Sequence, residues 1–228
     1  MENSQRSNFH NTTSTNGHFK HNLSLPPKEI LMQVRKSPSN SMALSNYVYV
    51  APSDFDRRVQ YIVVDEQYIF TICPNEQIQP GTLAFSNPHR KWAGVSLMQE
   101  ISVQTYDPLS ENDAIYIGNM ELEVGFLARN STTMDPFDTK ELAQAFCSKF
   151  YDQIFSIGQS LAFEFKGINL AISVIRLSLF NALDHESTEN QAPKTTRPKS
   201  HGIITQKTAI KFVRAPSSNI RLTGPFEM

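Results

Sequence analysis

The stretch PGTLAFSNPHRKWAGVS, residues 80–96, carries the densest cluster of structural signals in the chain. Pro80-Gly81 is typical of a tight turn. Trp92, the one tryptophan of the chain, is large enough to pin a following loop onto a β-sheet core. The adjacent cations Arg90 and Lys91 would then stand on a rigid loop, where charged side chains often contact partners. From these residues alone, a loop that only locks the fold and a loop that recognises charge both remain open.

On either side of this stretch, short β-branched and aromatic runs alternate with turn residues, which is typical of strands. One of them, Met120–Val124, alternates apolar and acidic residues as a half-buried antiparallel strand does. The expected strands are residues 47–50, 60–64, 68–73, 82–85, 101–106, 114–117 and 120–127, with Gly118-Asn119 as a turn between the last two. Many short strands and almost no helix predict a small closed barrel over residues 30–128.

The pattern changes after this barrel. Residues 129–138 lose the apolar alternation and are predicted to form a linker. From Leu142 to Ile154 apolar residues recur at three- and four-residue steps, which predicts a helix with Asp138 as its N-cap. Strands expected at residues 160–165, 170–177, 202–205 and 208–214 complete an α+β part over residues 139–224.

Three segments lack the signals of a packed element. Residues 1–29 are rich in Asn, Ser and Thr and are expected to form a disordered tail. Residues 184–200 are polar and contain proline, so we expect a mobile loop there, and residues 225–228 are expected to begin a further linker.

Between Glu189 and Glu227 every charged residue is basic, which favours either a solvated face or a surface for an acidic partner or phospholipid head groups.

Composition narrows the classes of function. The 228 residues carry a formal net charge of −1, so no general attraction to nucleic acid is expected. No apolar run is long enough to span a membrane, and the N-terminus lacks a signal-peptide pattern, so we expect a cytosolic protein. Cys73 and Cys147 lie in apolar stretches and are expected to be buried, reduced thiols.

A search for catalytic motifs favours a binding module over a barrel enzyme. None of the nine glycines is followed by lysine, as a P-loop requires, and no dinucleotide fingerprint occurs. The Asp-Thr-Gly turn of acid proteases, the Gly-Ser bond of pyruvoyl enzymes and the G-x-S-x-G elbow of serine hydrolases are also missing. We therefore expect no catalytic, cofactor-binding or metal-binding residue in this chain.

A set of stretches spread along the chain matches one protein family. They are residues 68–71, 80–81, 84–86, 90–94, 99–101, 135–139 and 155–159, together with Pro88, Ser96, Leu161, Phe163 and Phe165. Their order and spacing resemble the N-terminal domain of the N-ethylmaleimide-sensitive fusion protein (NSF), including its fungal secretory homologues. The resemblance runs from about Arg35 to Gly224, and its most specific motif is Arg-Lys-Trp-Ala-Gly after Ala-Phe-Ser.

The resemblance implies a double-psi β-barrel subdomain followed by a small α/β subdomain. In this family the N domain precedes two ATPase modules of a hexameric AAA ATPase, so ATP and magnesium are expected only in those modules, and this chain is expected to be a monomer. The N domain binds the adaptor SNAP (soluble NSF attachment protein), which coats SNARE complexes that the ATPase disassembles for vesicle fusion. The implied location is the cytoplasm, with peripheral recruitment to Golgi, endoplasmic reticulum and vesicle membranes.

The family's adaptor contact uses basic residues, which carry over by position onto four residues here. Arg90 and its neighbour Lys91 lie in the matching Arg-Lys-Trp run. Arg129 stands where the family has the first of two lysines, and Asn130 replaces the second, so one charge is lost. Lys36 precedes the matching Leu44-Ser45-Asn46 at the spacing of the family's N-terminal basic residue. The alternative is an N domain of the valosin-containing-protein type, which binds ubiquitin-pathway cofactors in the cleft between its subdomains.

Overall fold

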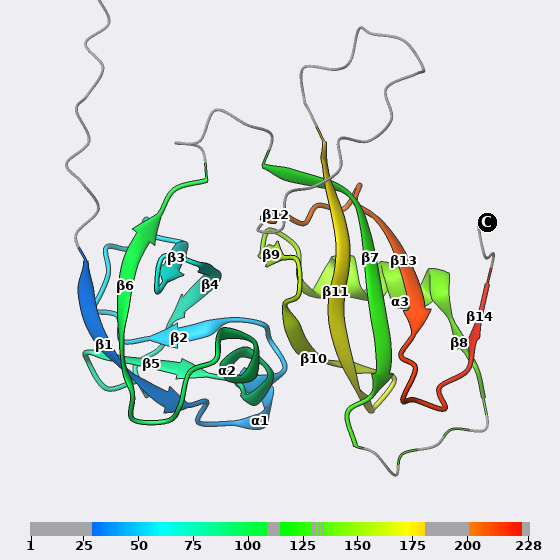
Figure 1. The fold of residues 1–228 in the computed structure, drawn as a ribbon, viewed down its shortest axis with the longest axis horizontal. Coiled ribbons are helices and arrows are strands. Elements are labelled where there is room, and N and C mark those ends of the chain that lie inside the picture. The colour runs from blue at the N-terminus through cyan, green and yellow to red at the C-terminus, as the bar shows by residue number, and fades with distance from the viewer. Residues whose placement is uncertain are drawn as a thin grey trace, which may run out of the picture.

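Two β-sheet bodies, joined side by side, make up the fold (Figure 1). The structure is a computed structural model that describes residues 29–108, 115–128, 131, 133, 135–180 and 201–224. The expected tail (all but Glu29), Arg129, the loop 184–200 and the linker 225–228 lie outside the described residues.

The first body is a closed barrel of six strands, which confirms the barrel expectation. Around the barrel the strands are β1 (Ile30–Lys36), β5 (Thr82–Phe85), β2 (Val48–Val50), β4 (Tyr68–Pro74), β3 (Tyr61–Val64) and β6 (Glu100–Tyr106). β1 with β5 and β2 with β4 are parallel pairs, and the remaining pairs are antiparallel. Buried apolar side chains of these strands fill the interior, among them Val34, Ile62, Phe70, Leu83 and Phe85.

Two short helices belong to the barrel, α1 (Asn40–Ala43) and α2 (Asn87–Ala93). These helices differ from the expectation of almost no helix, and Arg90 and Lys91 lie on α2 rather than on a loop. The expected strands do not include β1, although Met32 and Val34 are buried while Leu31 is exposed and Gln33 half-buried.

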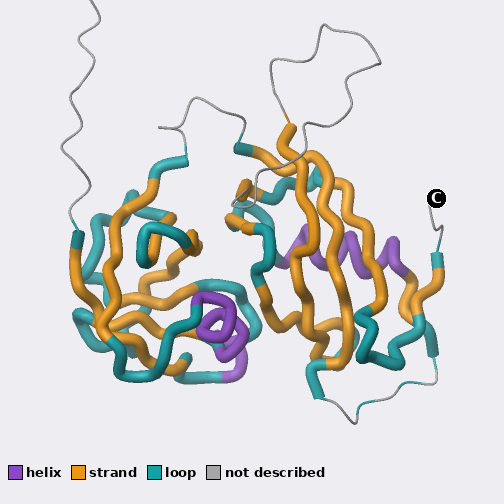
Figure 2. The backbone as a smooth tube through the Cα atoms, viewed as in Figure 1, coloured by secondary structure: helices purple, strands orange, loops and turns teal. Residues whose placement is uncertain are grey.

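The second body is a curled sheet covered by one helix (Figure 2). Its strands run in the order β10 (Ser160–Phe165), β11 (Ile168–Phe180), β7 (Tyr116–Phe126), β12 (His201–Ile203) and β9 (Ile154–Ser156), while β13 (Ala209–Arg214) also pairs with β7. A small sheet of β8 (Phe137–Asp138) and β14 (Leu222–Thr223) lies at its edge. The fold class, a double-psi-type barrel followed by an α/β part, is confirmed.

Helix α3 (Thr139–Lys149) begins where the sequence predicts. The Asp138 carboxylate accepts hydrogen bonds from the backbone amides of Lys140 and Glu141, as an N-cap does. The apolar face of the helix then packs into a core of aromatic rings, in which Phe146 contacts Phe150, Phe155, Phe163 and Phe212. This aromatic core fixes the helix against one face of the sheet.

The predicted end of the barrel at residue 128 is wrong. Residues 116–126 form one continuous strand, β7, so Gly118-Asn119 is not a turn, and β7 pairs with β11 and β13 of the second sheet. The barrel already closes at β6, which pairs with both β1 and β3 and leaves no edge for another strand. The alternation read in Met120–Val124 is confirmed, because its apolar residues are buried and its glutamates half-exposed.

A shared apolar cluster joins the two bodies. Tyr61 and Ile69 of the barrel pack with Ile154 and Ile203 of the second sheet. The Tyr61 hydroxyl donates to the Asp152 carbonyl at 3.1 Å. The bodies therefore form one packed unit.

In the described part of the chain no helix is long and apolar enough to cross a membrane.

Gly202 in β12 is the position where we expect the second sheet to tolerate a side chain least. A Cβ atom there would lie 2.5 Å from Leu179 Cδ2 and 2.9 Å from Ile117 Cγ1. Overpacking of this kind costs about 1–3 kcal/mol. Gly202→Ala should lower the free energy of unfolding by about that amount in urea denaturation. The matched control is Gly118→Ala, whose Cβ would come no closer than 3.4 Å to a neighbour; equal losses in both variants would contradict this packing account.

Candidate functional site: a cationic groove between the two bodies

Helix α2 places the two adjacent cations of the sequence motif. The Ser86 hydroxyl accepts a hydrogen bond from the His89 amide at 3.2 Å, and Pro88 lies in the first turn. Gly94 ends the helix with φ of 69°, a left-handed conformation that glycine adopts at low cost. The segment is therefore a capped helix of two turns rather than the expected loop.

Aromatic packing fixes the inner face of α2. The Trp92 ring meets the rings of Tyr68 and Phe70 edge-on, each with centroids 5.1 Å apart. His89 is fully buried beside Phe70. Because these side chains hold one face of the helix against the barrel, the exposed Lys91 and the half-buried Arg90 are held in defined positions.

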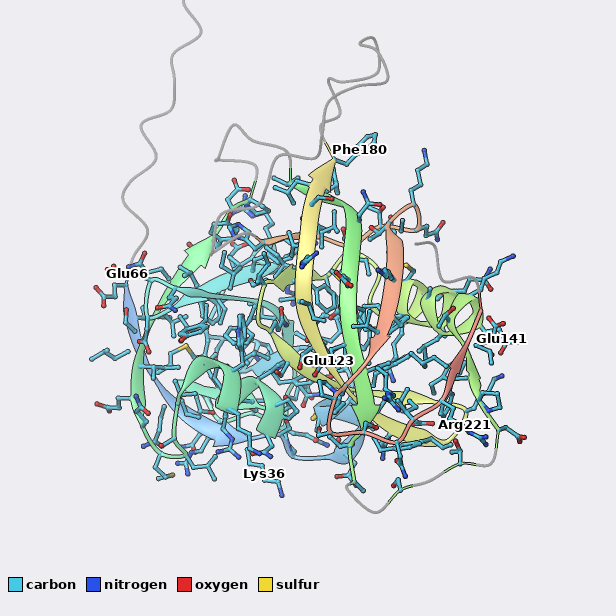
Figure 3. The ribbon with its side chains drawn as sticks, turned by 45° about the vertical axis from the view of Figure 1, so that its right-hand side comes forward. Lys36, Glu66, Glu123, Glu141, Phe180 and Arg221 are labelled. Atoms are coloured by element: carbon cyan, nitrogen blue, oxygen red, sulfur yellow. The ribbon has the colours of Figure 1, made fainter. Side chains whose placement is uncertain are left out.

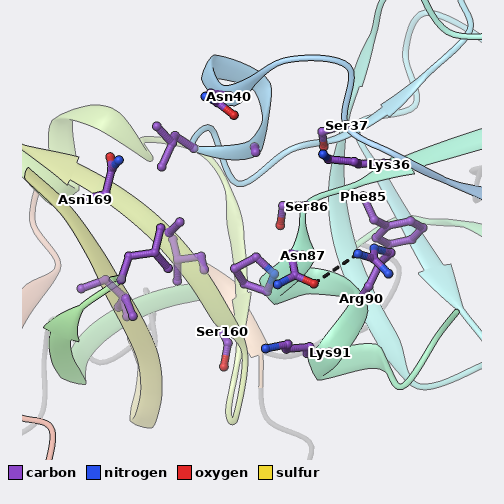
Figure 4. A pocket seen from close by; sticks show the side chains of 18 of the residues that line it. Lys36, Ser37, Asn40, Phe85, Ser86, Asn87, Arg90, Lys91, Ser160 and Asn169 are labelled. Carbon is purple, nitrogen blue, oxygen red and sulfur yellow. Dashed lines mark hydrogen bonds between the residues drawn. The ribbon is translucent and has the colours of Figure 1, made fainter. Parts of the chain in front are cut away.

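A groove of about 920 Å³ separates α2 and the end of β1 from the face of β10 and β11 (Figure 4). Lys36, Arg90 and Lys91 line the barrel side, and Leu127, Ser160 and Asn169 are among the residues of the other side. The structure thus brings three of the four predicted basic residues together. Arg129 lies outside the described residues, and Leu127, two positions before it, is part of the groove.

The charged residues that line the groove, among those described, are all positive: there are three cations and no carboxylate. Lys36 and Lys91 are exposed, and Arg90 is half-buried with its Nη2 donating to the Asn87 side-chain oxygen at 3.1 Å. None of the ion pairs in the described part of the chain involves any of these three residues. Their charges are therefore available to an anionic partner.

A buried polar junction lies behind the groove and was not predicted from the sequence. The Asn46 side-chain oxygen accepts from His89 Nε2 at 2.9 Å and from Gln159 Nε2 at 3.0 Å. The Asn46 amide group donates to the Gln153 side-chain oxygen at 3.0 Å, and Gln153 Nε2 donates to the Ser45 carbonyl. Asn46 and His89 belong to the barrel, whereas both glutamines belong to the second body. No local pattern reveals such a junction, because each of its hydrogen bonds joins residues that are more than forty positions apart.

The described residues of the groove provide basic and neutral polar side chains. The imidazole of His89, which precedes Arg90 in the chain, is hydrogen-bonded to Asn46 and is shielded from solvent. Within the described ranges, no group of three or more His, Cys, Asp or Glu side chains is placed to hold a metal ion. Cys147 is buried as expected, while Cys73 is half-buried, and the two thiols are not bonded to each other. The arrangement of side chains is suited to recognising a charged surface.

Comparisons with known proteins agree with this picture. No protein-family model matches the sequence. The vesicular-fusion protein sec18 of Schizosaccharomyces pombe is 38% identical over 208 residues, which cover 86% of this chain. The vesicle-fusing ATPase of Caenorhabditis elegans is 33% identical over 88% of the chain, and SEC18 of Saccharomyces cerevisiae is 31% identical over 84%.

This chain is homologous to the vesicle-fusing ATPases of the NSF/Sec18 family. The matches cover 25–27% of those three relatives, so the chain spans about a quarter of their length. Homology over most of the chain, together with the barrel and the α/β part, agrees with the resemblance to an N domain of this family.

The buried histidine predicts a pH dependence of stability. Burial lowers the pKa of His89 from 6.5 to about 4. Above pH 6.5 the imidazole is neutral in both states; between these two pKa values the unfolded chain binds a proton that the folded chain does not. The free energy of unfolding should therefore fall by about 1.4 kcal/mol per pH unit from this group as the pH drops from about 6.5 toward 4.

The check is urea denaturation at several pH values for the wild type and His89→Gln, which keeps a hydrogen-bonding side chain but does not titrate. The variant should be less stable at neutral pH and show a shallower slope over this range. Identical slopes would mean that His89 is not the group responsible.

Proposed function

We propose that this chain is the adaptor-docking domain of a hexameric AAA ATPase that disassembles SNARE complexes during vesicle fusion. It would bind the SNAP adaptor through Lys36, Arg90, Lys91 and Arg129. The observation that supports this proposal is the groove in which three cations lie without a carboxylate partner among the residues that the structure describes. The names of the relatives, vesicular-fusion proteins and vesicle-fusing ATPases, supply the biological setting.

In this proposal, recognition of the adaptor and hydrolysis of ATP belong to different parts of the whole protein. ATP hydrolysis, with its ATP and magnesium, is assigned to the three-quarters of the relatives' length that this chain does not match. The chain itself would work in the cytoplasm and reach vesicle, Golgi and endoplasmic reticulum membranes through the adaptor. It would contribute recognition and no chemistry.

The physics of the groove suits an adaptor that has to be released in each cycle. Exposed cations such as Lys36 and Lys91 meet acidic groups with little desolvation, so they raise the association rate and selectivity more than the affinity. Such contacts weaken as salt screens them. Modest binding by one domain becomes strong binding when several copies engage one coated SNARE complex.

Charge reversal in the groove tests this role. In calorimetric titrations against SNAP-coated SNARE complex at two salt concentrations, Arg90→Glu with Lys91→Glu should weaken binding about tenfold or more, because two attractive contacts become repulsive. The matched control is Arg57→Glu with Lys207→Glu, which changes the net charge equally at two exposed cations outside the groove. The control should bind like the wild type.

Other outcomes have distinct meanings. Equal losses in the two double variants would contradict a localised site and indicate a general charge effect. Binding that resists both the reversals and salt would point to the cofactor cleft of the valosin-containing-protein type, whose contacts are mainly apolar. Co-sedimentation of the chain with anionic vesicles in the absence of adaptor would favour a lipid surface instead.

A further inference from the structure

We infer that Asn46 is a positioning residue for the groove: its buried amide holds the cation-bearing helix α2 in register with the opposite wall. This inference rests on the proposed function only for what the groove binds. Asn46 itself does not line the groove and is 3% exposed, so it touches no partner. Its effect on binding would pass entirely through the geometry of the two walls.

Asn46 is the centre of the junction, because its side chain bonds to residues of both bodies. Each polar atom of the Asn46 side chain is bonded: the oxygen accepts from His89 and Gln159, and the nitrogen donates to Gln153. Hydrogen bonds between buried amides are directional, and an unsatisfied buried donor or acceptor costs about 1–3 kcal/mol. Sliding one body against the other would break several of these bonds together, so the junction favours a single register.

The junction connects to both walls of the groove. His89 lies one residue before Arg90 on α2, so its bond to Asn46 anchors the helix that carries two of the groove cations. Gln159 directly precedes β10, whose first residue, Ser160, lines the other wall. Within the same turn, a Cβ built on Gly158 would lie 3.7 Å from Trp92 Nε1, so this turn also approaches the side chain that pins α2.

The side chain of Asn46 lies outside both apolar cores, that of the barrel and that of the second body. Losing its side chain therefore removes no part of either core, and the cluster around Tyr61 and Ile154 still joins the bodies. The expected consequence is two intact bodies whose mutual register is less well defined.

The backbone at Asn46 determines which substitution isolates the side chain. Its φ is 61°, a left-handed conformation that asparagine and glycine adopt more readily than other residues. Asn46→Gly removes the amide without adding backbone strain, whereas Asn46→Ala would combine both effects. Glu66→Gly is the matched control, because Glu66 has φ of 55° and lies at the outer edge of the barrel, away from the second sheet (Figure 3).

The experiment has a geometric and a functional readout. Spin labels on cysteines introduced at Lys91 and Asn169, on opposite walls of the groove and with Cys73 and Cys147 replaced, report the distance across it by electron–electron double resonance. Asn46→Gly should broaden this distance distribution, and Glu66→Gly should not. Without labels, Asn46→Gly should weaken binding to SNAP-coated SNARE complex about tenfold while the slope of log affinity against log salt stays that of the wild type, because no charged contact is removed.

The salt slope distinguishes positioning from direct contact, since Arg90→Glu should change both the affinity and the slope. An unbroadened distance distribution in Asn46→Gly overturns the inference whether or not the chain binds the adaptor. Broadening with unchanged affinity also overturns it. If the wild type does not bind the complex, the proposed function fails, while the distance measurement still decides whether Asn46 fixes the distance between the two walls.

If Asn46→Gly does not fold, Gln153→Met takes its place under the same criteria. This variant removes two of the hydrogen bonds that the second body makes to the barrel.

Discussion

The buried amide of Asn46 is the constraint on which the arrangement of the two bodies depends. Apolar contacts such as those of Tyr61 with Ile154 supply attraction between the bodies, but they are non-directional and tolerate small displacements. Hydrogen bonds between buried amides do not, because each group has to find its own partner at a fixed distance and angle. The apolar cluster therefore holds the bodies together, and the polar junction determines how they are aligned.

This alignment gives the groove its composition. One wall comes from a helix held by Trp92 and His89, and the other from strands held by the aromatic core around Phe146. Neither wall is a groove alone, and the cations on the first wall face a second wall that offers no carboxylate among its described residues. A single-body fold with the same residues would leave Arg90 and Lys91 as ordinary surface charges. The interface between the two bodies is what places these two cations in a groove.

Local signals predicted the local parts of this structure. Asp138 followed by an apolar repeat was sufficient to place the start of α3, and the alternation in Met120–Val124 was sufficient to assign its buried face. The start and end signals of α2 were also present, as Ser86, Pro88 and Gly94. They were missed because a helix of two turns is too short to show an apolar repeat.

The remaining features depend on contacts that local patterns do not encode. Closure of the barrel at β6 depends on the pairing of β6 with β1, some seventy residues earlier, and this pairing excluded β7 from the barrel. Arg90 and Lys91 stand out in the cluster of residues 80–96 and Lys36 was identified through the family resemblance, and all three line a common groove in the structure. The Asn46 junction joins residues that are 43 to 113 positions apart, so only the folded chain reveals it.

A net charge of −1 is compatible with a strongly cationic site because the charges elsewhere are locally balanced. The Asp56 carboxylate lies 2.9 Å from Arg58 Nε, and the Glu141 carboxylate pairs with Lys166 Nζ, so the opposite charges of each pair cancel over a short distance. Exposed pairs of this kind contribute little stability, but they limit the field that those charges project. The cations of the groove have no such neighbours among the described residues, so their field extends into the groove. Placement of charge, rather than its total, is therefore what makes this surface suited to an acidic partner.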